Sequence, residues 1–172
     1  MAHIILITGG ARSGKSAEAE RRALAMSDHP VYMATAHVWD EEFRQRIALH
    51  QARRGPQWTN IEEERRLSRH DLTDRVVLVD CITLWLTNIF FALNDVDQAL
   101  DEAKAEFDRL TSQDATFIFV TNEIGSGGVS TDAVQRRFTD LQGWMNQYVA
   151  RRANEVVLMV SGLPLTIKND NT

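Results

Sequence analysis

The segment that decides the fold lies near the N-terminus and reads Gly9-Gly10-Ala11-Arg12-Ser13-Gly14-Lys15-Ser16. It directly follows the apolar run 4–7 and precedes the helix-forming stretch 17–26. This is the pattern G-x-x-x-x-G-K-S in the strand–loop–helix context that a phosphate-binding loop requires, which argues against a chance match by a glycine-rich turn. Backbone N–H groups of such a loop, together with the positive end of the helix dipole, face phosphate oxygens. We therefore expect a nucleoside triphosphate site, with Lys15 on the terminal phosphates and the Ser16 hydroxyl on Mg²⁺.

The composition is that of an ordinary globular protein. Of the 172 residues, 44% are apolar and 25% are charged, and the formal net charge is -5. This length suits one domain over 1–172, and the negative charge argues against a protein that mainly grips nucleic acid. Cys81 is the single cysteine and cannot form an internal disulfide, which favours a reducing cytoplasm. We expect no membrane span, because no uncharged apolar run is long enough, and no signal peptide, because a strand begins almost at once.

Apolar runs alternate with polar, helix-period stretches along the whole chain. The apolar runs predict strands at 3–8, 31–35, 76–80, 116–121 and 155–160, with a shorter one at 164–168 that would form an antiparallel edge. The polar stretches predict helices at 15–27, 39–54, 62–70 and 132–153, and two helices within 82–111 that break near Asn94-Asp95. The alternation indicates parallel βαβ units, and the continuous Val/Ile/Leu runs indicate strands buried on both faces. Ligand chemistry is then expected at the carboxyl ends of the strands.

Two carboxylates come at such strand ends. Asp80 follows the apolar run 76–79 and is expected to hold Mg²⁺ beside Ser16, with a turn or helix cap as the alternative. Glu123 follows the run 117–120 and precedes the glycine-rich loop 125–128. Its candidate roles are to activate an acceptor hydroxyl, to support the metal, or simply to brace the loop.

His50 lies on the predicted helix 39–54 among basic residues. Arg46, His50 and Arg53 have the spacing i, i+4, i+7, which places them on one face of that helix. A neutral imidazole nitrogen is a good nucleophile, and flanking guanidinium groups neutralise a phosphate under attack. A solvated surface histidine is the alternative. His37, which follows the second predicted strand, is a further candidate for a nucleotide contact.

Several short motifs follow one another along the chain. The set is 7–16, Tyr32-Met33-Ala34-Thr35-Ala36, Arg46-Ile47 with His50 and Trp58, 79–88, 121–125, 136–138 and 160–164. In this order and over essentially the whole chain, it resembles the bifunctional adenosylcobinamide kinase/adenosylcobinamide-phosphate guanylyltransferase family of cobalamin assembly. The resemblance and the strand–helix pattern both imply an α/β fold of the P-loop NTPase class, with a RecA-like, mostly parallel sheet and helices on both faces.

The resemblance implies two reactions on a corrinoid substrate. A nucleoside triphosphate, ATP or GTP, phosphorylates a hydroxyl of adenosylcobinamide; GTP then guanylylates a histidine, and GMP passes to the corrinoid phosphate. By its Arg-Ile-x-x-His spacing, that histidine corresponds to His50. The resemblance also implies a homotrimer with the active site near subunit contacts. Further GTP contacts are implied for Thr35, Ala36, His37, Gln51, Ala52, Arg53, Arg54, Glu62 and Thr83.

Two other functions stay open at this point. A P-loop kinase for another small alcohol or nucleotide would leave His50 inert. The second alternative is a non-catalytic nucleotide-dependent switch or assembly ATPase. A switch would more often carry a base-reading motif such as N-K-x-D, which the sequence lacks. Among these functions, only the guanylyltransferase predicts an acid-labile protein label from GTP labelled at its α-phosphorus.

Overall fold

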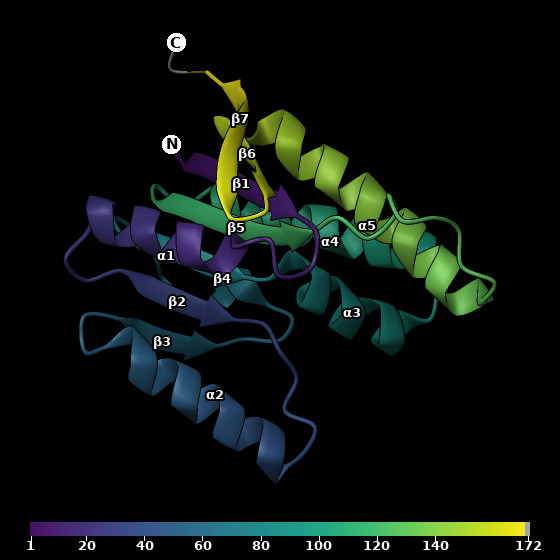
Figure 1. The fold of residues 1–172 in the computed structure, drawn as a ribbon, viewed down its shortest axis with the longest axis horizontal. Helices are drawn as coiled ribbons and strands as arrows, with labels where there is room; N and C mark the ends of the chain where they lie inside the picture. Colours follow the sequence, from purple (N-terminus) through teal and green to yellow (C-terminus); the bar gives the residue numbers. More distant parts are fainter. Residues whose placement is uncertain (171–172) are drawn as a thin grey trace.

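The structure, a computed structural model, describes residues 1–170. A single mixed sheet runs through it in the order β3-β2-β4-β5-β1-β6-β7 (Figure 1). The parallel strands are β1 (His3–Gly9), β2 (Val31–Ala34), β3 (Thr59–Glu62), β4 (Val76–Asp80), β5 (Thr116–Asn122) and β6 (Glu155–Val160). The last strand, β7 (Leu163–Asn169), pairs antiparallel with β6. The predicted antiparallel edge is therefore confirmed.

Five α-helices surround the sheet in the described residues, and their sequence signals explain where they begin and end. They are α1 (Lys15–Met26), α2 (Glu41–Arg54), α3 (Ile82–Leu93), α4 (Val96–Thr111) and α5 (Ala133–Arg152). Aspartate carboxylates at 40, 95 and 132 accept backbone hydrogen bonds at the starts of α2, α4 and α5. Asn94 ends α3 in the left-handed conformation, with φ 50°. The predicted break near Asn94-Asp95 is confirmed.

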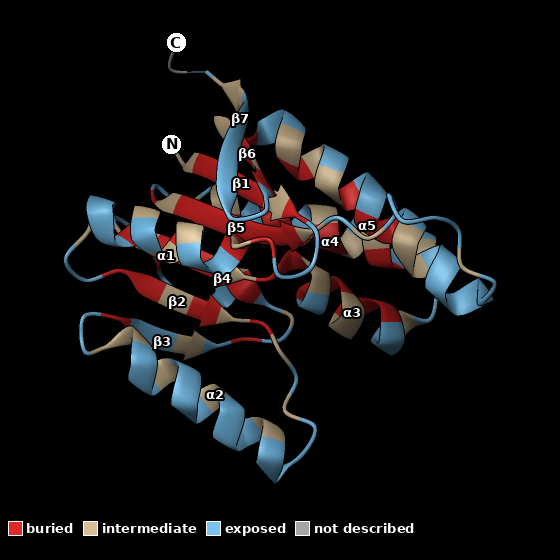
Figure 2. Cartoon of the chain, in the orientation of Figure 1, coloured by how far each residue is buried: buried red, intermediate tan, exposed pale blue. Residues whose placement is uncertain are grey.

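Alternate side chains of the central strands build two separate cores. In β1, Ile4 and Leu6 belong to the larger core with residues of α3, α4 and α5, whereas Ile5 and Ile7 belong to a smaller core with α1. Both faces of the sheet are therefore covered, and the central strands are buried (Figure 2). Burial on both faces is the reason why these strands are continuous apolar runs.

The helix predicted at 62–70 is wrong. The segment instead contains the end of β3, a turn, and one short 3₁₀ helix, η1 (Leu67–Arg69). Glu63 organises the turn: its buried carboxylate accepts hydrogen bonds from the backbone N–H groups of Arg65 and Arg66 and contacts His70. The Glu63 carboxylate thus accepts hydrogen bonds from backbone N–H groups that would bond to backbone carbonyl groups in a regular helix.

The sheet topology places the chemistry at one edge. The carboxyl ends of β1, β2, β4 and β5 all point the same way, and β5 lies between the strand of the phosphate loop and the strand that ends at Asp80. Helix α2 has no buried residue and runs along the β3 side of the sheet (Figures 1 and 2). In the described residues, no helix is long and apolar enough to cross a bilayer.

Candidate active site

The loop between β1 and α1 has the close approaches that its glycines predict. A Cβ atom at Gly9 would lie 2.6 Å from Ser13 Oγ and 2.9 Å from the Met159 carbonyl oxygen. Gly14 has φ 95°, a conformation that favours glycine. Ser13 Oγ is buried and makes no hydrogen bond within residues 1–170, so it is an unused donor inside the loop. A phosphate oxygen is the partner that such a loop usually supplies.

Lys15 is drawn into the same loop. Its side chain is buried, its ammonium group donates to the Gly10 carbonyl oxygen, and burial lowers its pKa. The ammonium group is therefore held against the backbone of the loop that would bind phosphates. Gly10, Ala11 and Arg12 form the exposed rim of the loop.

Ser16 and Asp80 meet at the predicted metal position. Ser16 Oγ donates to Asp80 Oδ2 over 3.0 Å, and the Tyr32 hydroxyl donates to the same oxygen over 2.6 Å. Adjacent ligands in an octahedral Mg²⁺ shell lie about 3 Å apart, so the Ser16 and Asp80 oxygens fit neighbouring positions of such a shell. Residues 1–170 contain no cluster of three or more His, Cys, Asp or Glu side chains that could hold a metal. A site with few protein ligands is typical of Mg²⁺ that also binds substrate phosphates.

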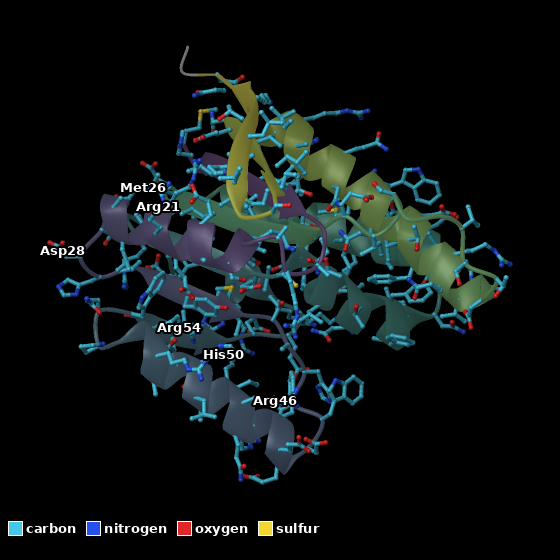
Figure 3. The ribbon with its side chains drawn as sticks, viewed as in Figure 1. Arg21, Met26, Asp28, Arg46, His50 and Arg54 are labelled. Atoms are coloured by element: carbon cyan, nitrogen blue, oxygen red, sulfur yellow. The ribbon has the colours of Figure 1, made fainter. Side chains whose placement is uncertain are left out.

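A cavity of about 410 Å³ joins this position to α2. Helix α1 contributes Ser16 and Glu20, and the strands β2 and β4 contribute Tyr32, Ala34 and Asp80. Ala36 comes from the loop after β2 and Leu84 from α3, and α2 contributes Phe43, Arg46, Ile47, His50 and Arg54. Figure 3 shows Arg46, His50 and Arg54 along one side of α2. The cavity therefore unites the predicted metal position and the predicted nucleophile, which are far apart in the sequence.

Arg54 takes the place that the helical spacing gave to Arg53. Arg53 is exposed and lies outside the cavity lining. The Arg54 guanidinium lies 3.5 Å above the Tyr32 ring centroid and donates to Asn60 Oδ1 over 2.9 Å. These contacts with β2 and β3 hold Arg54 on the side of α2 that faces the sheet.

Several other predicted nucleotide contacts lie outside the cavity. Thr35 is buried, and its hydroxyl bonds both the N–H and the carbonyl of Cys81, so it ties β2 to the end of β4. His37 contacts Glu64 over 2.9 Å. Thr83 Oγ1 accepts from the Asn122 backbone N–H. The cavity lining also lacks Gln51, Ala52 and Glu62.

Glu123 braces the glycine-rich loop. Its two carboxylate oxygens accept hydrogen bonds from the backbone N–H groups of Gly125 and Ser126, and from the Ser126 hydroxyl. The Ser126 hydroxyl makes the largest contribution to lowering the Glu123 pKa. A carboxylate that is stabilised in this way is a weak proton acceptor, so the geometry favours the bracing role over activation of a hydroxyl.

Two polar residues of the cavity were missed by the sequence reasoning, Glu20 and Tyr32. Burial and Asp80 raise the pKa of Tyr32, so its hydroxyl stays a hydrogen-bond donor to Asp80. Burial also raises the pKa of Glu20, against the opposing effects of Arg54 and His50. A signal existed for Glu20, because it lies four residues after Ser16 and hence on the same face of α1. Tyr32 gave no such signal, since its role depends on contact between β2 and β4.

The chain is similar to known proteins over nearly its whole length. The profile of the family described as cobinamide kinase / cobinamide phosphate guanyltransferase matches residues 5–167. The chain is 42% identical to the bifunctional adenosylcobalamin biosynthesis protein CobP of Pseudomonas aeruginosa, over 96% of this chain and 97% of that protein. It is 38% identical to the bifunctional adenosylcobalamin biosynthesis protein CobU of Escherichia coli, over 96% and 99% of the two chains.

A comparison of solved structures shows the fold alone. The crystal structure of the flagellar accessory protein FlaH from Methanocaldococcus jannaschii matches 97% of this chain and 78% of its own, with a TM-score of 0.50 and 15% sequence identity. The assignment of the chain to a functional family rests instead on the profile match and on the two relatives, which span nearly the full chain. The chain belongs to the cobinamide kinase / cobinamide phosphate guanyltransferase family.

Proposed function

We propose that this bifunctional enzyme carries out both reactions of its family at the one cleft between the phosphate loop, β4 and α2. ATP or GTP would donate the phosphoryl group, GTP would donate the guanylyl group, and adenosylcobinamide and its phosphate would be the corrinoid acceptors. The single observation that carries this proposal is the shared cavity, whose lining includes Ser16, Asp80 and His50.

The kinase step needs mainly positioning and charge neutralisation. The substrate hydroxyl oxygen forms a bond to the γ-phosphorus while the bond to the bridging oxygen breaks, so that the nucleoside diphosphate leaves and the hydroxyl proton passes to solvent. Lys15 and the N–H groups of the loop from Gly9 to Ser16 would hold the phosphates, and Mg²⁺ on Ser16 and Asp80 would neutralise their charge. Glu123 would hold the adjacent loop in shape, which its three hydrogen bonds support.

The guanylyl step needs a nucleophile. A ring nitrogen of His50 would form a bond to the α-phosphorus, and pyrophosphate would leave with the electrons of the broken P–O bond. Arg46 and Arg54 would neutralise the phosphate under attack, which their place beside His50 in the cavity supports. An oxygen of the corrinoid phosphate would then displace the imidazole and take the GMP.

The remaining predicted nucleotide contacts are Thr35, Ala36, His37, Gln51, Ala52, Arg53, Glu62 and Thr83. Ala36 lines the cavity, and we propose it as a direct contact. Thr35 would act by holding the end of β4. For the others we propose contacts with the nucleoside, beyond the phosphates.

We also propose a homotrimer in the cytoplasm. The outer strand β7 carries the exposed apolar side chains Leu163, Leu165 and Ile167, a surface suited to contact with another copy. The sequence has a single cysteine, Cys81, whose thiol is buried, and a reducing compartment suits such a lone thiol. Light scattering of the purified protein gives the number of copies directly.

Labelling with GTP tests the proposed function. The protein is incubated with Mg²⁺ and GTP labelled at either the α- or the γ-phosphorus, without any corrinoid. We expect covalent label from the α-position only, stable in base and lost in acid, because protonation of a phosphoramidate nitrogen makes it a good leaving group. A protein that phosphorylates cobinamide but takes up no α-label would instead be a kinase alone.

A further inference from the structure

Glu20 and His50 are two uncommitted ionisable side chains in the cleft. Within residues 1–170, neither makes a hydrogen bond or a salt bridge. The other charged groups that line the cavity have at least one partner: Asp80 binds Ser16 and Tyr32, Arg46 pairs with Glu42, and Arg54 donates to Asn60 through Nη2. The buried Nε–H of Arg54 has no hydrogen-bond partner in the described residues. Glu20 is therefore the one carboxylate of the described lining that is free to take a new donor.

Glu20 and His50 line the same cavity from two different helices, α1 and α2. Glu20 follows Ser16 by four residues, so it lies one helical turn further along the same face of α1. His50 enters the cavity from α2, on the side shown in Figure 3. The Glu20 carboxylate is half-buried and interacts electrostatically with Arg54, Asp80 and His50. The unused donors of the described lining include the buried Nε–H of Arg54, whose Nη2 binds Asn60, and the imidazole N–H of His50. Of these two, the imidazole N–H is the one whose bond to this carboxylate would orient the nucleophile.

Building on the proposed function, we propose that Glu20 is a positioning residue for His50 in the guanylyl step, where its carboxylate accepts a hydrogen bond from one ring N–H. The other ring nitrogen is then unprotonated and directed at the α-phosphorus. When that nitrogen forms the P–N bond and pyrophosphate departs, the ring keeps its N–H and becomes cationic. The Glu20 carboxylate offsets that positive charge.

This role predicts an effect on one reaction more than on the other. The kinase step uses no histidine nucleophile, so Glu20 contributes to it only through the general charge of the cleft. Two other roles predict different results. A carboxylate that supports Mg²⁺ beside Asp80 would affect both steps and would respond to Mg²⁺ concentration. A carboxylate that only stabilises the fold would lower the thermal stability and both activities together.

The test compares Glu20→Gln with Glu20→Asp. Glu41→Gln is the matched control, because Glu41 lies on the exposed first turn of α2 near Arg44 and outside the cavity. The rate of adduct formation is measured in single turnovers without corrinoid, as a function of GTP and of Mg²⁺ concentration. Kinase rates and thermal unfolding are recorded for each variant.

We expect Glu20→Gln to lower the maximal rate of adduct formation by about 100-fold, because loss of a carboxylate that orients and stabilises a catalytic imidazole typically costs at least this much, with little change in the GTP concentration at half-saturation. The kinase rate should fall far less, and Glu20→Asp should recover part of the lost rate. The inference would be overturned if Glu20→Gln lowered both activities equally, or if added Mg²⁺ restored its rate of adduct formation. If wild-type protein forms no adduct, the proposed function itself fails. If wild-type protein forms the adduct and Glu20→Gln forms it at the same rate, only the role of Glu20 fails.

Discussion

Tyr32 contacts the predicted metal position through its hydroxyl and the helix that carries His50 through its ring, and the substitution Tyr32→Phe tests the hydroxyl contact alone. The hydroxyl donates to Asp80 Oδ2 over 2.6 Å, and the ring of the same residue lies under the Arg54 guanidinium at 3.5 Å. Phenylalanine keeps the ring and its contact with Arg54. The substitution therefore removes one hydrogen bond to a carboxylate and little else.

The expected size of the effect follows from the type of bond. A hydrogen bond to a charged group contributes about 1.5–3 kcal/mol to stability. Asp80 keeps the bond from Ser16 and remains partly accessible to water, which places Tyr32→Phe near the lower end of that range. For a chain of this length we expect a fall in Tm of about 3–6 °C. A less firmly held Asp80 should also slow the Mg²⁺-dependent reactions by about tenfold, as loss of a contact behind a metal ligand usually does.

Urea unfolding of a double-mutant cycle measures the bond directly. The cycle uses wild type, Tyr32→Phe, Asp80→Asn and the double variant, and it gives the coupling between the two side chains. We expect a coupling free energy of about 1 kcal/mol or more. Additive effects, or a Tyr32→Phe variant as stable as wild type, would refute the reasoning.

Three further predictions follow from the same structure. Lys15→Ala should abolish phosphorylation and guanylyl transfer while the protein stays folded, because one loop serves both reactions; full guanylyl transfer by this variant would require a second nucleotide site. Asp80→Asn should lower kcat more than nucleotide affinity in a Mg²⁺ titration, since a metal-bound carboxylate acts mainly on charge that develops in the transition state; a normal kcat would contradict the metal role. Burial opposes ionisation of Glu106, but hydrogen bonds from Ser68 and Arg109 outweigh it and lower the pKa of Glu106, so its contribution to stability should be present above about pH 4.5 and be lost as the pH falls through the folded-state pKa. Urea unfolding at a series of acidic pH values gives the free energy of unfolding as a function of pH, and this free energy should change less steeply with pH in Glu106→Gln than in wild type. An unchanged pH dependence would exclude this contribution.

The parts of the fold that could be predicted are those with a local signal. The phosphate loop has fixed glycine positions, and the central strands are apolar throughout because both of their faces are buried. β3 had no such signal: it is an edge strand whose residues, Thr59 to Glu62, contain a single large apolar side chain. The polar run after it resembled an exposed helix, and only the burial of Glu63 shows why the chain turns there instead.

The site was predictable where one element carries the pattern, and not where two elements must meet. His50 and Arg46 share a face of α2, as their spacing predicts. The spacing does not distinguish between Arg53 and Arg54, because the choice depends on Tyr32 and Asn60 in neighbouring strands. Tyr32 itself was missed for the same reason. Whether His50 forms the covalent bond stays a prediction.

Mass spectrometry of GTP-treated protein tests the central claim most directly. Wild-type protein and His50→Ala are incubated with GTP and Mg²⁺ without corrinoid, kept out of acid, and analysed both intact and as peptides. The account predicts one GMP adduct on wild-type protein, located at His50, and no adduct on His50→Ala, which should still phosphorylate cobinamide in part. An adduct that persists in His50→Ala, or that maps to His37 in the wild type, would contradict it.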